Sequence, residues 1–213
     1  MKKKFLMLLM ILTMFVLTAC GMTEEEASAY VKASLDAAYK GEFEEFVEIT
    51  DSTIEGAQAM YEENMVHTME AAGFSDMEIN DELIGKYKQL FLDISKSVNY
   101  TVGAATETEN GEFEVQVEIN PLLVFTNISE EEITEAVIDR IMDMKKYPSD
   151  EKITEIAFEE MYEILVEEIK EPTYSDEKIV QSVGVHKDED GMYYISEEDM
   201  LALDNVFFDL ENK

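Results

Sequence analysis

The sequence is poor in several residue types on which protein chemistry often depends. Its 213 residues include one cysteine, two histidines and 16 basic residues, against 49 acidic ones. A lone cysteine excludes a disulfide bond within the chain. The formal net charge of −33 argues against nucleic acid as a partner, because binding to phosphates needs a basic surface that displaces counterions. It also argues against adsorption of the chain to anionic lipid, which attracts basic segments.

Long apolar runs are scarce as well, and the longest lies at the start. Phe5 to Leu17 contains only one polar residue, Thr13, and follows the basic residues Lys2 to Lys4. As a helix this run would be roughly 20 Å long, too short for the hydrocarbon layer of about 30 Å. A basic start, a short apolar run and small residues after it are typical of a secretory signal peptide. We therefore expect residues 1–19 to be removed.

The residues that end this run, Leu17-Thr18-Ala19-Cys20, resemble the lipobox of bacterial lipoproteins. The resemblance implies that Cys20 carries diacylglycerol on its sulfur and becomes the first residue of the mature chain. Two acyl chains anchor a protein stably, so the predicted location is the extracytoplasmic face of the cell membrane, with residues 20–26 as a lipidated tether. The alternative is a plain signal peptide followed by a chance cysteine. After Cys20 the longest strictly apolar run is Leu122 to Phe125, so we expect no second membrane element.

Residues 27–213 are predicted to form a single extracytoplasmic domain. The hydrophobic content is 46%, with 11 Phe and 10 Tyr, which suffices for a core despite the charge. The chain has three prolines and nine glycines, and no stretch rich in proline, glycine or serine divides it. The excess of acidic residues is best explained as a solvated surface, although it would also suit a cationic partner.

Periodicity predicts amphipathic helices and two β-hairpins. Apolar residues recur at helical spacing in several segments, the clearest being Leu83 to Val98. Capping boxes are predicted at Thr23/Glu26, Ser52/Glu55 and Ser129/Glu132. Between residues 100 and 119 the period changes to two, which predicts a hairpin with Tyr100, Val102 and Ala104 on one side and a wet face opposite. A second hairpin is predicted over 179–195, with its turn at 188–191. The predicted fold class is α+β, with helices packed on an antiparallel sheet.

The body of the chain also resembles a group of uncharacterised small lipoproteins of Gram-positive bacteria. The resemblance lies in the element "YKGEFEEF", Tyr39 to Phe46, and in the ending "YYISEEDMLALDN", Tyr193 to Asn205. It implies no activity. The broken first helix and the antiparallel hairpins are similar to cystatin-like and nuclear-transport-factor-like α+β cones, an analogy of fold alone.

Few residues suggest chemistry. In "HKDEDGMYYISE" the residues Asp188, Asp190, Gly191 and Glu197 match part of a calcium-loop pattern, but His186 occupies its first position, where a carboxylate belongs. A hairpin turn explains these residues without a metal. His67 and His186 lack the companions that a metal or acid–base site needs. We predict no catalytic residue, no metal site and no cofactor.

The sequence thus predicts a membrane-anchored protein without an enzymatic activity. Its expected role is an interaction or ligand-binding module, whose contacts are the membrane through Cys20 and a protein or cationic ligand of the cell envelope. The alternative is an envelope enzyme, or a subunit of one, with a substrate cavity in the α+β domain. A pocket lined by convergent polar groups with shifted pKa values would favour that alternative.

Overall fold

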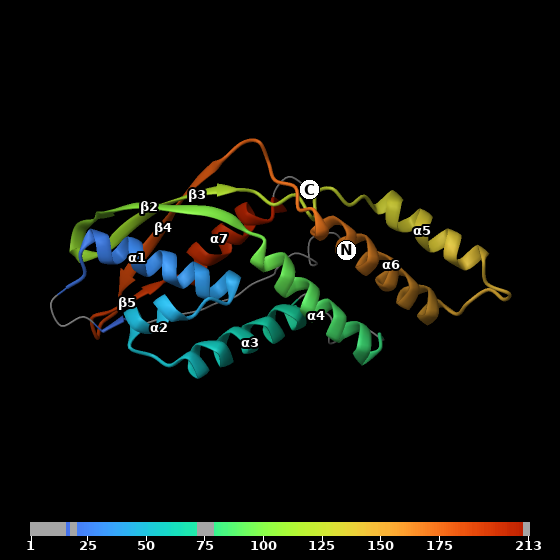
Figure 1. Ribbon diagram of the computed structural model, residues 1–213, viewed down its shortest axis with the longest axis horizontal. Coiled ribbons are helices and arrows are strands. Elements are labelled where there is room, and N and C mark those ends of the chain that lie inside the picture. The colour runs from blue at the N-terminus through green and yellow to red at the C-terminus, as the bar shows by residue number, and fades with distance from the viewer. Residues whose placement is uncertain (1–15, 18–20, 72–78, 211–213) are drawn as a thin grey trace.

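An antiparallel sheet forms the centre of the fold (Figure 1). The computed structural model describes residues 16–17, 21–71 and 79–210. The strands lie in the order β1-β5-β4-β3-β2. Their bounds are β1 Val16–Leu17, β2 Asn99–Glu107, β3 Phe113–Asn120, β4 Ile179–Lys187 and β5 Met192–Ile195. The helices are α1 Glu24–Leu35, the π-helix η1 Asp36–Lys40, α2 Glu44–Thr50, α3 Ile54–Ala71, α4 Asp81–Lys96, α5 Glu130–Met142, α6 Asp150–Lys170 and α7 Glu197–Phe207.

Two hairpins build the sheet, as the sequence predicts. β2 pairs with β3, β4 pairs with β5, and the pairing of β3 with β4 joins the two hairpins. The α+β class is therefore confirmed, whereas the cystatin-like analogy stays a prediction. β1 pairs with Tyr193 and Met192 of β5 and lies within the predicted signal peptide. Removal of residues 1–19 would leave a sheet of the other four strands.

The β2–β3 hairpin differs from the predicted one by a single residue. Val102 pairs with Val117, but the next pair is Ala105 with Val115, so β2 has one extra residue between them. Such a β-bulge shifts the side chains that follow it to the other face of the sheet. Ala105 is buried and Ala104 is exposed, so the prediction that Ala104 continues the side of Tyr100 and Val102 was wrong.

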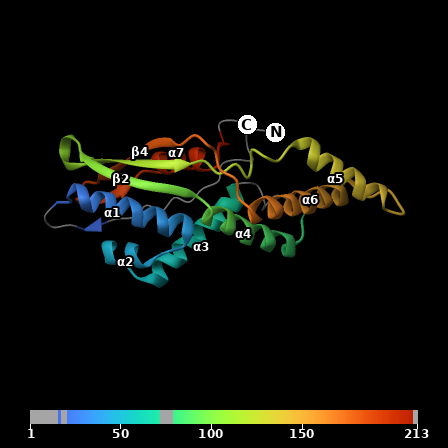
Figure 2. The same ribbon diagram turned by 45° about the horizontal axis from the view of Figure 1, so that its top comes forward.

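β3 shows which face of the sheet is covered. Phe113, Val115, Val117 and Ile119 are buried, whereas Glu114 between them is exposed. α1 packs against β2 and β3, and α7 packs against β3 and β4, so these two helices cover the buried face (Figures 1 and 2). The predicted wet face of the first hairpin is confirmed.

α1 begins as predicted and ends in an unexpected way. The Thr23 hydroxyl accepts a hydrogen bond from the Glu26 N–H, and the Glu26 carboxylate accepts one from the Thr23 N–H, which completes the predicted capping box. After Leu35 the helix continues as the π-helix η1, a wider turn often found at functional sites. Gly41 ends η1 with φ 69°, a left-handed conformation that glycine adopts without strain.

The predicted capping box of α3 was wrong. The Thr53 hydroxyl, not that of Ser52, accepts the hydrogen bond from the Gly56 N–H, at 3.1 Å, and the helix begins at Ile54. Both residues have a hydroxyl in the right part of the sequence, so the pattern alone did not separate them. The predicted end of this helix at Gly73 lies outside the described residues.

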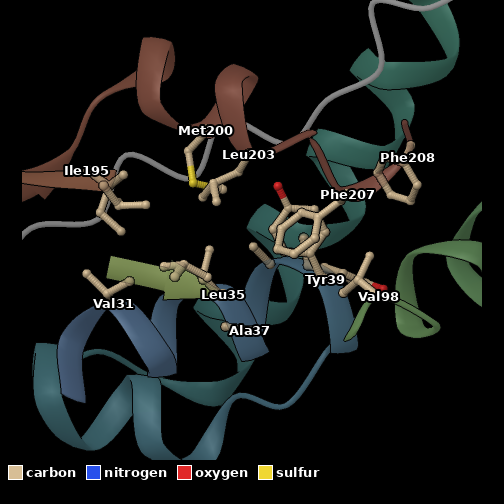
Figure 3. Packing of buried hydrophobic residues seen from close by; sticks show 14 of the residues in the cluster. Val31, Leu35, Ala37, Tyr39, Val98, Ile195, Met200, Leu203, Phe207 and Phe208 are labelled. Atoms are coloured by element: carbon tan, nitrogen blue, oxygen red, sulfur yellow. The ribbon is translucent and has the colours of Figure 1, made fainter. Parts of the chain in front are cut away.

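Buried aromatic side chains join η1 to α7 (Figure 3). Tyr39 of η1 and Phe207 of α7 are both fully buried, and their rings meet edge to face with centroids 4.7 Å apart. Tyr100 of β2 contacts the same phenylalanine, with ring centroids 5.4 Å apart. Leu35 of α1 and Leu203 of α7 point into the same layer. The core is therefore continuous from α1 through the sheet to the last helix.

α5 and α6 form a helical hairpin that extends from the body (Figure 1). We call Glu130–Lys170 the arm. Ser129 and Ser149 cap its two helices, and no residue of α5 is buried. Its far end exposes apolar side chains, including Met142 at 72% and Tyr147 at 80%.

The aromatic joint at Phe207 should dominate the stability of the domain. Replacing Phe207 with alanine should lower the free energy of unfolding by about 3–5 kcal/mol, because a fully buried ring leaves a cavity. Tyr147→Ala on the exposed end of the arm should change it by no more than about 0.5 kcal/mol. Urea unfolding followed by circular dichroism measures both changes. Equal effects of the two substitutions would contradict this account of the core.

Candidate functional site

The predicted lipidation site, Cys20, lies outside the described residues, so its modification stays a prediction. The adjoining segment is held closely to the domain. Met22 is buried, and its N–H donates a hydrogen bond to the Tyr193 hydroxyl at 3.2 Å. Glu24–Glu26, predicted as the end of the tether, belong to α1. A lipid on the cysteine would therefore be linked to the folded domain almost directly through Gly21.

The acidic segment between β4 and β5 is a hairpin turn, as predicted. The Asp188 Oδ1 atom accepts hydrogen bonds from the N–H groups of Asp190, at 3.0 Å, and Met192, at 2.8 Å. Gly191 adopts φ 84°, and Glu197 is the first residue of α7. The carboxylate of Asp188 thus stabilises the backbone of the turn.

His186 contacts two carboxylates in an arrangement unlike a catalytic triad. Its Nε2 atom lies 3.1 Å from Asp199 Oδ2, and its Nδ1 atom lies 3.8 Å from Glu112 Oε2. The Ser196 hydroxyl bonds to the same Asp199 carboxylate and caps α7. Since the carboxylate lies between serine and histidine, His186 has no direct path to the serine proton, which a triad requires. The side chain of His67 is outside what the structure describes.

A cluster of polar and charged groups surrounds the buried carboxylate of Asp36 at the start of η1. Its carboxylate accepts hydrogen bonds from Lys32 Nζ at 2.7 Å, Lys40 Nζ at 2.7 Å and the Tyr100 hydroxyl at 2.6 Å. Burial alone would raise the pKa of Asp36, but these three hydrogen bonds outweigh burial and lower the pKa below its ordinary value. The ionised carboxylate ties α1 and η1 to β2.

A second buried carboxyl group, that of Asp204, has a pKa that is shifted in the opposite direction. The Tyr39 hydroxyl donates a hydrogen bond to Asp204 Oδ1 at 2.6 Å, and both side chains are buried. The Asp204 Oδ2 atom has no hydrogen-bond partner within the described residues. Burial raises the pKa of Asp204 well above its ordinary value, although the bond from Tyr39 partly opposes this shift. Burial therefore favours the neutral carboxyl.

The strongest candidate site is a cleft of about 290 Å³ between α3, α4 and the end of η1. α3 and α4 approach and contact each other in this part of the molecule (Figure 1). We call this the lysine cleft. Its lining residues are Lys40, Gly41 and Phe43 after η1, Gln58, Tyr61, Glu62 and Met65 of α3, and Lys88, Leu92 and Lys96 of α4. Lys40, Gly41 and Phe43 belong to the element "YKGEFEEF", Tyr39 to Phe46, so this element supplies one wall of the cleft.

The lysine cleft concentrates positive charge in a chain with a net charge of −33. Lys40 is paired with Asp36 at 2.7 Å. Lys88 and Lys96 make no ion pair with any of the described residues. One carboxylate, that of Glu62, lines the cleft beside the three lysines. Positive charge therefore exceeds negative charge at its walls.

Tyr61 adds a hydrogen-bonding group to the lysine cleft. Its side chain is 8% exposed, and its buried hydroxyl has no hydrogen-bond partner in the described part of the chain. The ring meets Phe43 edge to face at 5.7 Å, and Gly41 packs against it, where a Cβ would lie 3.6 Å from the ring. Burial, with a smaller contribution from Asp93, raises the pKa of Tyr61 to about 12. The hydroxyl therefore keeps its proton at neutral pH and remains a donor.

A second cleft, of about 320 Å³, is lined by residues of α4, α5 and α6. Its cations are already neutralised. Arg140 bonds to both Glu159 and Glu160 of α6, and Lys86 pairs with Glu82. The Arg140 pairs join α5 to α6 within the arm, and the Lys86 pair lies within α4, so this cleft offers less free charge than the lysine cleft.

Among the side chains that the structure describes, no group of three or more from His, Cys, Asp and Glu is arranged to hold a metal ion. The helices that the structure describes are each too short or too polar to cross a bilayer.

Sequence reasoning missed the lysine cleft. Lys88, Leu92 and Lys96 recur every four residues, so the sequence alone indicates that they share one face of a helix. The opposite wall of the cleft cannot be predicted in this way, because residues near position 60 and residues near position 90 meet only through the packing of α3 on α4.

Asp204 should make the stability of the domain depend on pH. Its pKa is raised on folding, so its favourable contribution is complete below the unfolded pKa and is lost as pH rises through the folded pKa. Asp204→Asn removes this titration. The stability of the variant relative to the wild type should therefore increase with pH, by up to about 1.4 kcal/mol per pH unit.

Urea unfolding between pH 5 and 8 measures this difference, and Asp190→Asn in the exposed turn is the matched control for loss of one carboxylate. A constant difference between wild type and Asp204→Asn across this range would show that Asp204 does not take up a proton on folding.

Comparison with known proteins identifies a solved structure with a similar fold but no related sequence. No protein-family model matches the chain, and no curated protein matches its sequence. A solved structure has the same fold, the crystal structure of "a putative lipoprotein (ycdA) from Bacillus subtilis subsp. subtilis str. 168", with a TM-score of 0.61 and 16% sequence identity. The match covers 86% of this chain and 56% of the other, so this chain spans little more than half the length of that protein.

Proposed function

We propose that this protein is a lipid-anchored, extracytoplasmic lipoprotein that binds a ligand without transforming it. The observation that carries the ligand-binding role is the lysine cleft, which is lined by two lysines and a tyrosine hydroxyl that have no partner within the described part of the chain. The anchoring role rests on the single cysteine and the residues before it. The fold shared with the "putative lipoprotein" from Bacillus subtilis supports the same assignment.

The short link to the membrane supports display of the domain outside the cell. Met22 is docked on the domain, so a lipidated Cys20 would hold the start of α1 within about 10 Å of the bilayer surface. The arm extends from the opposite end of the molecule (Figure 1). The arm would then point away from the membrane, and the acidic domain would be held beside lipid that does not attract it.

The chemistry of the described side chains favours binding over catalysis. Tyr39 and Asp204, whose pKa values are raised well above their ordinary values by burial, line neither cleft. In the lysine cleft, the pKa of about 12 makes Tyr61 a donor and a poor base. An envelope enzyme would need a nucleophile or an acid–base pair aimed into a cavity. The lysine cleft instead presents cationic groups, a neutral donor and apolar side chains.

The anchor is tested by replacing Cys20 with serine in the organism's own envelope or in a bacterial host. The wild-type protein should fractionate with membranes, and its intact mass should show a diacylglyceryl group on a chain that begins at residue 20. Cys20→Ser should lose both the modification and cleavage at this position, because serine has no sulfur for the thioether.

Thr23→Ala is the matched control, since it changes a nearby residue and keeps the cysteine. It should remain lipidated and membrane-bound. Processing of Cys20→Ser at the same bond, with unchanged membrane retention, would overturn the anchoring proposal.

A further inference from the structure

We infer that the lysine cleft binds a small amphiphilic anion, in which one carboxylate or phosphate group is attached to an apolar chain. This inference rests on the proposed ligand-binding function and names the chemical class of the ligand.

Charge is the first argument. With 49 acidic residues in the chain, a lysine on its surface has many opportunities to form an ion pair. Lys86 of α4 shows the ordinary outcome, since it pairs with Glu82 at 2.9 Å. Lys88 and Lys96 on the same helix form no such pair with a residue that the structure describes, and both line the lysine cleft. Two ammonium groups at one cleft without a described acidic partner are suited to an external anion.

Helix geometry explains how these groups converge. Lys88 and Lys96 are eight residues apart, with Leu92 midway, so the three side chains share one face of α4. Across the cleft, Tyr61 and Met65 are also four residues apart and share one face of α3. Each wall thus combines polar groups with an apolar side chain.

The neutral donor strengthens the argument for an acceptor ligand. The hydroxyl of Tyr61 is buried and has no hydrogen-bond partner among the residues that the structure describes, and its pKa of about 12 keeps it protonated. A buried polar group without a hydrogen bond costs free energy, which a ligand that supplied an acceptor would recover. Carboxylate and phosphate oxygens are such acceptors, whereas an ammonium ligand has none.

The apolar residues and the volume define the rest of the ligand. Phe43, Met65 and Leu92 line the same cleft as the lysines, so an apolar chain can be buried beside the charge. A volume of about 290 Å³ is at the lower end of the range for small-molecule sites. Glu62 is the opposing charge, and its carboxylate accepts a hydrogen bond from the Gln58 amide within the wall. The ligand is therefore a short-chain amphiphile rather than a polymer.

The binding test uses the full lipid-anchored protein in nanodiscs of zwitterionic phospholipid. The probes are octanoate and octyl phosphate, with octanol and octyltrimethylammonium as neutral and cationic analogues of the same chain length, and inorganic phosphate without a chain. Methionine methyl groups labelled with ¹³C report binding by NMR. The Met65 signal should shift and saturate with the two anionic amphiphiles, while the Met142 signal on the arm should not move.

Substitutions test which lysines hold the charge. Lys88→Gln and Lys96→Gln should each weaken octanoate binding by about tenfold, the effect expected for a lost hydrogen bond to a charged group. Lys86→Gln on the same helix is the matched control and should change the affinity by less than about twofold, because its ammonium group pairs with Glu82. Lys88→Arg should retain binding, and higher salt should weaken it.

The outcomes separate the two proposals. Stronger binding of octanoate than of octyl phosphate would identify a carboxylate ligand, and the reverse order a phosphate; either supports the inference. If octanol or octyltrimethylammonium shifts Met65 at equal or lower concentration, or if Lys86→Gln weakens octanoate as much as Lys88→Gln, the anionic ligand is overturned while a ligand site remains. If no probe shifts Met65, both the anionic ligand and the ligand-binding role of this cleft are overturned.

Discussion

The π-helical turn Asp36–Lys40 is the constraint on which the rest of this structure depends. It places Tyr39 inward, against Phe207 and the Asp204 carboxyl, and so attaches the first helix to the last. It places Lys40 outward, where the lysine bonds to Asp36 and lines the cleft beside α3 and α4. One widened turn therefore joins the hydrophobic core to the candidate ligand site.

The distribution of charge gives the molecule two different kinds of surface. Among the described acidic residues, only Asp36 and Asp204 are buried, and the remaining negative surface should not attract anionic lipid. The positive charge at the lysine cleft is local, because Lys88 and Lys96 lack acidic partners among the described residues. The expectation of a cationic ligand came from the net charge and stays a prediction for the acidic surface. A ligand of the lysine cleft would instead be negatively charged, because contacts with nearby charged groups outweigh the screened charge of more distant ones.

Hydrophobic periodicity predicted burial correctly within single helices and strands. The apolar stripe of α4 and the alternation of β3 appear as predicted, because periodic burial needs no knowledge of the partner. Errors arose where two neighbouring residues compete for one role. Thr53 caps α3 in place of Ser52, and the bulge in β2 buries Ala105 in place of Ala104. A shift of one residue is invisible to a pattern but decides which side chain faces the core.

The sequence by itself determined the acidic character of the protein, the α+β class, the order of its helices and hairpins, and the lipobox resemblance at Cys20, since each depends on composition or on neighbouring residues. Only the tertiary structure decided which long-range partners meet. It brought Asp204 to Tyr39, left Lys88 and Lys96 without an ion pair to any residue in the described ranges, and formed a cleft between two helices around Tyr61. The physical reason is that burial, pairing and pKa depend on distances between segments far apart in the chain, and these distances exist only after the helices have packed on the sheet.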